Sequence, residues 1–414
     1  MSKVVGIVAE YNPFHNGHFY HLEESKRLAQ ADYCICIMSG NFTQRGEPSI
    51  TNKWAKAYMA LCGGANLVIE LPLEYSISSA ENFASGAIKI LNSLKIVDSI
   101  SFGAECDDLS TLNNIANVLY NEPAEYKNIL SHELKKGISY PAARENAIMM
   151  YLNDIKKYAN VMTDSNNILA IEYLKALKAQ KSLINPILIK RQKVYYNDDR
   201  IVDDFASATA IRKLLYRKDY KQLSKVVPRS TYQILAEEYK RGKIILGLQE
   251  YEKEIIYTLR KMKIEEIAEL PDVSEGLEYS IKRAVGENNN IADVIYSIKS
   301  KRYTETRIKR ILLYALLGID KKMMENSKKI IPYTRVLAFD GKGKELLSEI
   351  VNANPKINMI TSVSKYVQQN SKKGSKQLME MLEKDIFATD VYTLGYEYES
   401  KANLDFTNNM IIIK

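Results

Sequence analysis

Long apolar runs are absent from this sequence of 414 residues. No stretch of about 18 consecutive apolar residues occurs, so a transmembrane helix is not expected. The N-terminus passes from Met1 directly into the short apolar run at residues 4–9, without the charged and apolar regions of a secretory signal peptide. We therefore expect a cytoplasmic protein with no membrane association. The hydrophobic content of 46% is typical of a globular chain, and the length predicts two or three domains.

Cysteine is scarce as well. The four cysteines form no Cys-x-x-Cys pair, so a zinc site made from them is not expected. Cys34 and Cys36 alternate with isoleucines, which is typical of one face of a buried strand. We interpret all four as reduced, buried thiols.

The net charge of +8 is unevenly distributed. Residues 1–180 contain 16 Lys+Arg and 19 Asp+Glu, a net of −3, so residues 181–414 contain the other 42 and 31, a net of +11. A basic half joined to a nearly neutral half predicts a polyanionic partner. A lysine-rich surface that favours solubility explains the same charge equally well.

The first hundred residues alternate short apolar runs with helical patterns. Strands are predicted at residues 4–9, 33–38, 67–71 and 100–102, and helices at 17–29, 51–62 and 79–94. This alternation predicts a parallel sheet with right-handed crossovers. Ligands bind at the carboxyl ends of strands in such sheets, so the loops of interest are 10–18, 39–47 and 103–107.

The rest of the chain is more helical. Residues 108–180 are predicted to be mostly helical, with a further strand at 186–190 and a helix at 207–216. Helical periodicity dominates from about residue 225 to 317. Strand patterns return at 334–338 and 359–363 and predict a small α/β unit, and we interpret the polar run 321–329 as a linker.

Histidine is rare and clustered. Three of the four histidines, His15, His18 and His21, fall within seven residues directly after the first predicted strand. Pro13 stiffens the turn, and Gly17 lets the backbone approach a ligand closely. The helix that begins near Gly17 points its amino end at this loop, which favours an anion there. Two imidazoles at spacing i, i+3 can then donate hydrogen bonds to the charge that grows as pyrophosphate leaves.

A metal pair made by His15 and His18 is the competing interpretation. No Glu or Asp lies one turn away to complete a His-Glu-x-x-His type of site, so we expect no protein-bound metal. His21 is interpreted as structural rather than catalytic, and His132 as a surface residue.

The strand, loop and His-x-Gly-His run at 15–18 resemble the HxGH nucleotidyltransferase superfamily, which binds ATP with this motif. Ser-Ala-Thr-Ala-Ile-Arg at 207–212 resembles its Ser-x-Thr-x-Ile-Arg signature, which contacts the β- and γ-phosphates. The resemblance implies an α/β fold with a Rossmann-like parallel sheet. We expect this ATP-binding catalytic domain at 1–225, a mainly helical basic region at 226–325 and a small α/β unit at 326–414. Ser207 and Thr209 as simple helix-capping residues are the alternative.

Departures from the superfamily pattern narrow the substrate. Small members begin the loop with Gly-Thr/Ser-Phe-Asp-Pro, whose hydroxyl helps to receive a phosphate nucleophile, whereas Glu10 stands at that place here. A carboxylate would repel a phosphate, which disfavours a small-molecule adenylyltransferase, the main alternative function. An RNA-binding factor with a decayed nucleotide site is disfavoured by the intact histidine motif, and an aminoacyl-tRNA synthetase by the lack of a Lys-Met-Ser-Lys-Ser-like motif.

Taken over most of its length, the chain resembles the bacterial tRNA(Met) cytidine acetate ligases. The resemblance is carried by Ala-Glu-Tyr-Asn-Pro-Phe-His-Asn-Gly-His (9–18), Met-Ser-Gly-Asn-Phe-Thr-Gln-Arg-Gly-Glu-Pro (38–48), Ser-Phe-Gly-Ala-Glu (101–105), Ser-Asn-Asn-Ile-Leu-Ala (165–170) and Lys-Arg-Tyr-Thr-Glu-Thr-Arg-Ile-Lys-Arg (301–310). It implies that acetate attacks ATP to give acetyl-adenylate and pyrophosphate. The acetyl group then passes to N4 of the wobble cytidine of elongator tRNA(Met).

The resemblance also implies roles for individual residues. His15 and His18 are expected to be catalytic, and ATP, with Mg²⁺, is expected to contact Ile7, Val8, Ala9, Glu10, Tyr11, Asn12, Pro13, Phe14, His15, Asn16, Gly17, His18, Phe19, Tyr20, Gly103, Asn166, Arg191, Ser207, Thr209 and Arg212. Asn167 is a near-equal alternative to Asn166. Arg45 is a candidate for contact with acetate or a phosphate, and a surface arginine is its competing interpretation.

A basic run near residue 300 is the candidate for tRNA binding. Cations interleaved with an aromatic ring suit phosphates and a stacked, unpaired base; these residues are Lys299, Arg302, Tyr303, Arg307, Lys309 and Arg310. An ordinary basic helix face is the competing interpretation. The expected partners are therefore tRNA(Met), acetate and ATP, with no stable protein partner.

Overall fold

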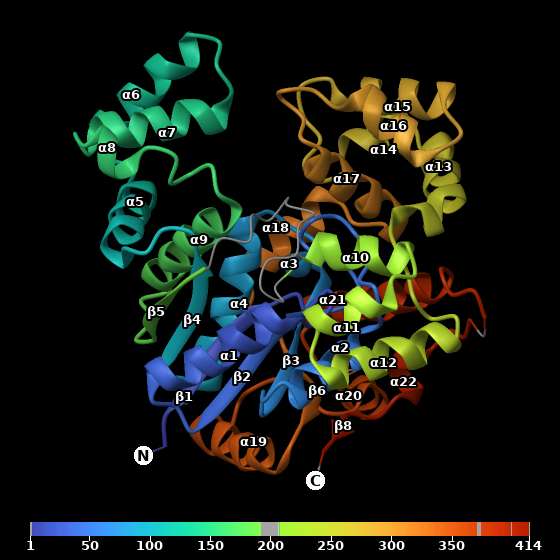
Figure 1. The fold of residues 1–414 in the computed structure, drawn as a ribbon. Helices are drawn as coiled ribbons and strands as arrows, with labels where there is room; N and C mark the ends of the chain where they lie inside the picture. Colours follow the sequence, from blue (N-terminus) through green and yellow to red (C-terminus); the bar gives the residue numbers. More distant parts are fainter. Residues whose placement is uncertain (1, 192–205, 207, 371–373, 399, 414) are drawn as a thin grey trace.

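A computed structural model describes residues 2–191, 206, 208–370, 374–398 and 400–413. Its centre is one eight-stranded sheet in the order β5-β4-β1-β2-β3-β6-β7, with β8 paired to β6 (Figure 1). The strands are β1 (Val4–Ala9), β2 (Tyr33–Ser39), β3 (Leu67–Leu71), β4 (Ser99–Ala104), β5 (Asn185–Lys190), β6 (Thr334–Phe339), β7 (Met359–Ile360) and β8 (Ile411–Ile412). Every strand predicted from the sequence is present, and only β8 was not predicted.

The five N-terminal strands are parallel, as predicted. The strand β1 lies between β2 and β4, so the chain crosses the sheet in one direction from β1 to β3 and then returns to the other side of β1. The carboxyl ends of β1 and β4 therefore border the switch point of the topology. Open α/β sheets bind their ligands at such a point.

Helices cover both faces of the sheet because the parallel strands are apolar on both sides. In β2, Ile35 and Ile37 pack into the core beneath α4 (Ala80–Leu94), α5 (Leu109–Asn121) and α9 (Ser165–Ala179). Cys34 and Cys36 face the opposite core, with α1 (Asn16–Ala29), α2 (Lys53–Cys62), α10 (Ala208–Tyr216), α11 (Tyr220–Val226) and α12 (Arg229–Lys240). The alternation along one strand thus feeds two separate cores.

The prediction of four buried thiols holds for only part of the set. All four cysteines are free, and Cys34 and Cys36 are buried. Cys62 is exposed at the end of α2 and Cys106 is half-buried. The sequence pattern located the two strand cysteines because alternation specifies a face, whereas neither of the other two lies in a strand.

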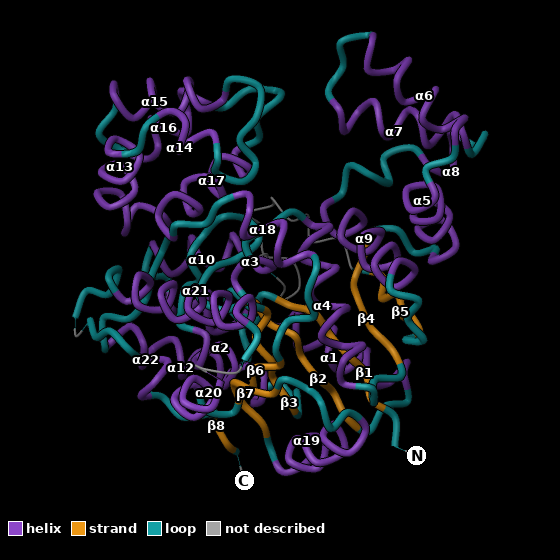
Figure 2. Tube along the Cα trace, turned by 180° about the vertical axis from the view of Figure 1, so that it is seen from behind, coloured by secondary structure: helices purple, strands orange, loops and turns teal. Residues whose placement is uncertain are grey.

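The α/β pattern predicted for residues 326–414 is present, but its strands extend the N-terminal sheet instead of forming a second one. The strand β6 pairs antiparallel with β3, and β7 and β8 pair with β6 (Figure 2). An unpaired edge on β3 would expose backbone donors and acceptors, and the C-terminal chain covers it. The domain boundary expected at 325/326 therefore cuts through one continuous sheet.

The polar run 321–329 is not a linker but mostly helix α18 (Lys321–Lys328). Asp320 caps it, since its carboxylate accepts from the backbone N–H of Met323 at 2.8 Å. Lys89 donates to the carbonyls of Lys328 at 2.6 Å and Ile330 at 2.9 Å, beyond the last turn. Local polarity suggested a loop, but these tertiary contacts stabilise a helix.

Two groups of helices project above the carboxyl edge of the sheet (Figures 1 and 2). One contains α5, α6 (Ala124–Lys135), α7 (Tyr140–Tyr151) and α8 (Ile155–Tyr158). The other contains η1 (Leu248–Tyr251), α13 (Glu252–Lys261), α14 (Ile264–Ala268), α15 (Leu277–Glu287), α16 (Ile291–Ile298) and α17 (Glu305–Leu317). Its apolar core also includes residues from outside this group, among them Phe42, Leu73, Ile77 and Tyr392. The remaining helices are α3 (Leu73–Ser76), α19 (Gly341–Ala353), α20 (Val363–Asn370), α21 (Lys376–Thr393) and α22 (Leu404–Thr407).

The helical nature predicted for residues 226–325 is therefore confirmed. Among the described residues, no helix is both long and apolar enough to cross a membrane.

Candidate active site

A cavity of about 440 Å³ lies at the switch point, between the carboxyl ends of β1, β4 and β5 and the first turns of α1 and α9. Its size is that of an ordinary small-ligand pocket. Most residues proposed from the sequence line it, namely Ile7, Val8, Ala9, Glu10, Tyr11, Asn12, His15, Gly17, His18, Tyr20, Arg45, Gly103, Asn166, Arg191 and Arg212.

Within the described part of the chain, five of the proposed ATP contacts lie outside this lining: Pro13, Phe14, Asn16, Phe19 and Thr209. Phe14 is fully buried beneath the loop, where a Cβ added to Gly63 would lie 2.3 Å from its ring. Asn16 donates to the carbonyl of Lys225 at 2.8 Å and so joins α1 to α11. A contiguous stretch of sequence cannot all face one ligand, because helix and strand turn alternate side chains away. Ser207 lies outside the described residues.

His15 and His18 form a stacked pair with ring centroids 3.6 Å apart. His15 is the N-cap of α1, and the backbone N–H of His18 donates to its Nδ1 at 3.3 Å. In return, the backbone N–H of His15 donates to Nδ1 of His18 at 3.3 Å. Since both Nδ1 atoms accept, each neutral ring carries its proton on Nε2. The loop thus holds two N–H donors side by side.

Burial keeps these rings neutral. Burial, with a smaller contribution from Arg191, lowers the pKa of His15 to about 3. Burial also lowers the pKa of His18 well below its usual range, assisted by the neighbouring His15. Uncharged imidazoles can donate hydrogen bonds to an anion that enters the cavity, and an anion close to them would in turn favour their protonated forms.

His21, which the sequence suggested to be structural, also lines the cavity. Burial lowers its pKa to about 4. Its Nε2 atom is buried and has no hydrogen-bond partner among the described residues. The structure therefore places the third histidine at the same cavity, one helical turn beyond His18.

The neighbours Asn166 and Asn167 lie on different sides of α9, and only Asn166 lines the cavity. Asn166 lines the cavity, where its side chain donates to Glu105 at 2.5 Å and accepts from Arg191 at 3.0 Å. Asn167 is buried, and its side chain accepts from the backbone N–H of Cys106 at 2.9 Å. Asn166 therefore positions an arginine at the cavity, whereas Asn167 supports the loop after β4.

An apolar wall of the cavity was missed by the sequence analysis. It is formed by Phe83 of α4, Phe102 of β4, and Ile168, Leu169 and Tyr173 of α9. Their periodicity predicts buried helix and strand positions, but it does not distinguish a core from a ligand pocket. A flat apolar wall beside polar groups suits a purine ring.

Glu10 lies directly after β1 and lines the cavity. Its carboxylate accepts from the backbone N–H of Gln44 at 2.6 Å, and burial raises its pKa. Lys56 donates to the carbonyls of Glu10 at 3.0 Å and Ser39 at 2.9 Å. Burial lowers the pKa of Lys56 to about 7. This buried lysine ties the carboxyl ends of β1 and β2 together.

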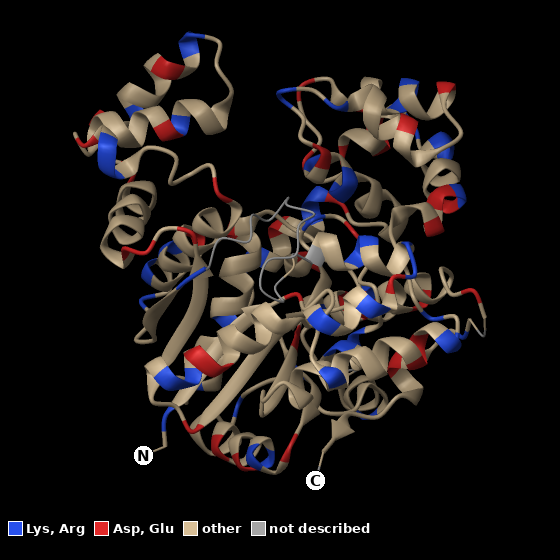
Figure 3. Cartoon of the chain, viewed as in Figure 1, with Lys and Arg blue, Asp and Glu red and all other residues tan. Residues whose placement is uncertain are grey.

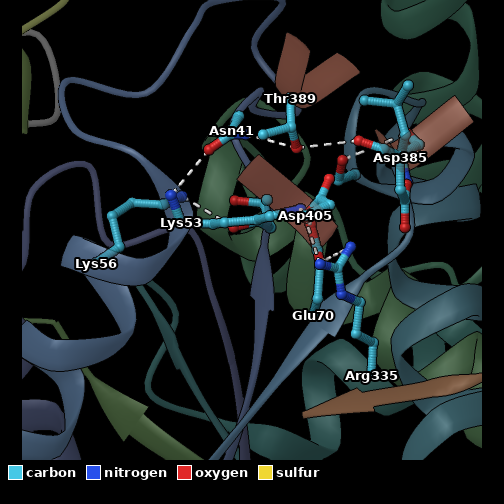
Figure 4. Close-up of polar contacts among 12 residues, drawn as sticks. Asn41, Lys53, Lys56, Glu70, Arg335, Asp385, Thr389 and Asp405 are labelled. Carbon is cyan, nitrogen blue, oxygen red and sulfur yellow. Dashed lines mark hydrogen bonds and ion pairs between the residues drawn. The ribbon is translucent and has the colours of Figure 1, made fainter. Parts of the chain in front are cut away.

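A buried ionic cluster joins α2, β3, β6 and α22 (Figure 4). Lys53 of α2 pairs with Glu70 of β3 at 3.0 Å and with Asp405 of α22 at 2.8 Å, and Arg335 of β6 pairs with Glu70 at 3.1 Å and also with Asp405. The side chain of Asn41 accepts from the backbone N–H of Lys53 at 2.8 Å. The cluster therefore connects the C-terminal chain to the base of the loop that carries Arg45.

That loop also packs against α17. Gly46 has φ +76°, and a Cβ there would lie 2.5 Å from the backbone nitrogen of Arg310. Glu47 of the loop pairs with Arg212 at 3.1 Å and with Lys309 at 2.8 Å. Arg212 also donates to the hydroxyl of Thr209 at 3.2 Å. Arg212 of α10 and Lys309 of α17 thus meet at Glu47 of the loop.

Two of the six residues proposed for tRNA binding, Tyr303 and Lys309, are half-buried, and Lys309 pairs with Glu47 and Glu305. The other four fall into two groups. Arg310 is nearly buried against Asp272 at 2.8 Å, and Arg307 donates to the carbonyl of Asp272 at 2.6 Å. Lys299 and Arg302 are exposed, although they pair with Glu305 and Glu275 respectively. Arg307 and Arg310 therefore stabilise the helical region through Asp272. Lys299 and Arg302 are the proposed residues whose exposure suits contact with RNA.

The comparisons with known proteins agree with this geometry. The family described as HIGH Nucleotidyl Transferase matches residues 2–406, so the chain belongs to the HIGH nucleotidyltransferases.

Within that class it is a member of the tRNA(Met) cytidine acetate ligase family. It is 46% identical over 408 residues to the tRNA(Met) cytidine acetate ligase of Thermoanaerobacter sp. (strain X514), covering 99% of both chains. It is 43% identical to that of Acetivibrio thermocellus, covering 99% of this chain and 100% of the other.

Two solved structures have the same fold. The apo form of Thermotoga maritima TmcAL superposes with a TM-score of 0.94 at 33% identity, covering 99% of both chains. The same protein bound with alpha-thio ATP superposes with a TM-score of 0.92 at 32% identity, again over 99% of both chains. The parallel-sheet nucleotidyltransferase fold predicted from the sequence is therefore confirmed.

Proposed function

We propose that this chain activates acetate with ATP and transfers the acetyl group to N4 of the wobble cytidine of elongator tRNA(Met). The observation that carries the proposal is the stacked pair of the buried His15 and the half-buried His18, which holds two imidazole donors at the switch-point cavity. Membership of a ligase family that modifies tRNA(Met) supplies the substrate class.

In the first step, a carboxylate oxygen of acetate attacks the α-phosphorus of ATP. The bond from this phosphorus to the bridging oxygen breaks, and pyrophosphate leaves with the electron pair. The Nε2–H groups of His15 and His18 donate to the phosphate oxygens on which negative charge grows. Arg191, held by Asn166 at 3.0 Å, adds a cation to the lining of the same cavity.

In the second step, the cytidine amino nitrogen attacks the acetyl carbonyl. A carbon–nitrogen bond forms, the bond from carbon to the AMP oxygen breaks, AMP leaves with the electron pair, and the amino nitrogen releases a proton to solvent. The adenylate must be kept from water until the RNA base arrives. The loop 39–48, anchored by Lys53 and packed against α17, forms the cavity wall nearest the helical region.

Magnesium would enter with the ATP phosphates. Among the described residues, no group of three or more His, Cys, Asp or Glu side chains could hold a metal ion. Bound in this way, the ion would neutralise part of the triphosphate charge, and the side chains described here would orient the nucleotide.

Incorporation of labelled acetate tests the proposal. The wild type and its His15→Ala and His18→Ala variants are incubated with ATP and purified elongator tRNA(Met), and His132→Ala on the exposed face of α6 serves as the matched control. We expect label at the wobble cytidine with the wild type and the control, and a loss of about 10²- to 10³-fold in each cavity variant.

Two outcomes would contradict the proposal. Absence of label with the wild type, together with pyrophosphate release that requires a different small substrate, would instead support a small-molecule adenylyltransferase. Undiminished labelling in both cavity variants would show that His15 and His18 do not contribute to catalysis.

A further inference from the structure

A second hollow, of about 820 Å³, adjoins the ATP cavity. It is a groove between α10 on one side and η1, α16 and the start of α17 on the other. Arg212 lines both the groove and the cavity, and Glu47, which pairs with it at 3.1 Å, also lines the groove. Arg212 therefore forms the boundary that the groove shares with the proposed site of acetyl activation.

Two tyrosines on this groove are unusually exposed. Tyr216 at the end of α10 is 72% exposed and Tyr296 of α16 is 82% exposed. Neither ring takes part in the apolar cores, which are formed by other residues of the same helices. An aromatic ring left open on a groove provides a flat platform on which a base can stack.

The charge of the groove is positive. Five of its lining residues are cations and three are carboxylates. Each carboxylate is already engaged, since Glu47 pairs with Arg212 and Lys309, Glu305 pairs with Lys299, and Glu252 accepts from the backbone N–H of Ile291 at 2.8 Å. Lys213 of α10 and Arg217 directly after this helix add cations, and Figure 3 shows Lys and Arg in blue on α10 and on α17. A phosphodiester backbone would complement this surface.

We infer that this groove binds the unpaired nucleotides that flank the acceptor cytidine, with their bases stacked on Tyr216 and Tyr296. The inference rests on the proposed function, and it adds the place and the mode of RNA contact. Cations and stacking rings track the strand without reading its sequence. The acceptor base alone would pass Arg212 into the ATP cavity.

The position of the groove beside the ATP cavity favours RNA over a protein partner. When a base of the RNA enters the ATP cavity, the nucleotides on either side of it must lie against the surface next to the cavity. Binding of a partner protein would not require this particular surface. A base that undergoes chemistry is turned out of its stack, and its neighbours then need a surface to rest on.

The test compares Tyr216→Ala, Tyr296→Ala and the double variant with Tyr279→Ala. Tyr279 is 62% exposed on α15 of the same helical group and does not line the groove. Three quantities are measured: acetate-dependent exchange of pyrophosphate into ATP without RNA, the KM for tRNA(Met) in acetylation, and the Kd for its isolated anticodon stem-loop.

We expect each groove variant to raise the KM and the Kd by about ten-fold or more. The exchange reaction, which involves no RNA, should keep its wild-type rate, and Tyr279→Ala should match the wild type throughout. A fully paired RNA duplex in place of the stem-loop should bind the wild type only as weakly as the stem-loop binds the double variant. Arg217→Gln should lower the salt dependence of binding by a log–log slope of about 0.7.

Unchanged KM and Kd in the double variant, with an active wild type, would overturn the inference and leave the proposed function intact. A wild type without acetate-dependent exchange or acetylation would overturn both. If the double variant keeps its RNA affinity but loses a self-association of the wild type seen by sedimentation, the groove is a protein contact and the inference is wrong.

Discussion

The ammonium group of Lys53 and the carboxylate of Asp405 form a buried ion pair of 2.8 Å between two ends of the chain. Lys53 begins α2, directly after the loop that carries Arg45, and Asp405 lies in α22 near the C-terminus. Neither charge could be buried alone without a large desolvation cost. The C-terminal segment therefore belongs to the architecture of the active site, although it lines none of the cavity among the described residues.

Asp405→Asn should destabilise the protein strongly. The change leaves Lys53 and Arg335 with one fewer buried anion, and breaking a buried pair on one side costs about 3–5 kcal/mol. Chemical denaturation followed by circular dichroism measures the loss. Glu380→Gln is the matched control, because Glu380 pairs with Lys376 at 3.7 Å on an exposed helix face and such a pair contributes about 0–1 kcal/mol. Equal losses in the two variants would show that the cluster does not hold the C-terminal segment.

Stability should fall as the pH drops below about 6.5. His15 and His21 have folded-state pKa values of about 3 and about 4, so both stay neutral in the native state while the unfolded chain takes up protons. Because the unfolded state binds more protons between about pH 6.5 and 4, each residue should lower the unfolding free energy by roughly 2 kcal/mol at pH 5 relative to pH 8.

The comparison that isolates this effect uses the double variant His15→Gln/His21→Gln and the exposed control His132→Gln. Urea denaturation is measured from pH 8 to pH 5. We expect a flatter pH profile in the double variant and the wild-type slope in the control. A wild-type slope in the double variant would mean that the two rings are not held neutral.

Gly63→Ala should destabilise the histidine loop by crowding Phe14, the residue packed beneath it. The new methyl group would lie 2.3 Å from the ring of Phe14, which is fully buried under that loop. Overpacking of a filled core typically costs about 1–3 kcal/mol, and a displaced Phe14 would shift His15 beside it. We expect a lower thermal midpoint together with a higher KM for ATP. Gly286→Ala on α15, where a Cβ meets nothing within 4 Å, is the control, and equal effects of the two changes would refute the argument.

Asn166→Ala should weaken ATP binding. The variant removes the acceptor that holds Arg191 at 3.0 Å, and hydrogen bonds to charged groups contribute about 1.5–3 kcal/mol. We expect the KM for ATP to rise about ten-fold or more, while the KM for acetate changes little. Asn114→Ala is the control, since its amide donates to the hydroxyl of Tyr158 at 3.1 Å away from the cavity. An unchanged KM for ATP would show that Arg191 does not need this support.

Local features of the chain were predictable because their causes are local. The strands at residues 4–9 and 67–71 were placed correctly from apolar runs, and the helix after His15 from its periodicity. Clustering of three histidines after the first strand located the cavity. In contrast, the sequence could not separate Asn166 from Asn167 or show that Arg310 turns toward Asp272, because both depend on which side of a helix meets a distant segment.

The sequence by itself predicted most of the elements and the parallel order implied by their alternation, and it located the histidine loop that lines the cavity. Tertiary structure alone decided that β6 completes the sheet against β3, and that His21, Tyr173 and Phe83 face the cavity. It also decided that Lys53 meets Asp405. The physical reason is the same in each case: periodicity specifies which residues share a face, whereas the partner of that face is selected by burial and charge pairing between segments far apart in the sequence.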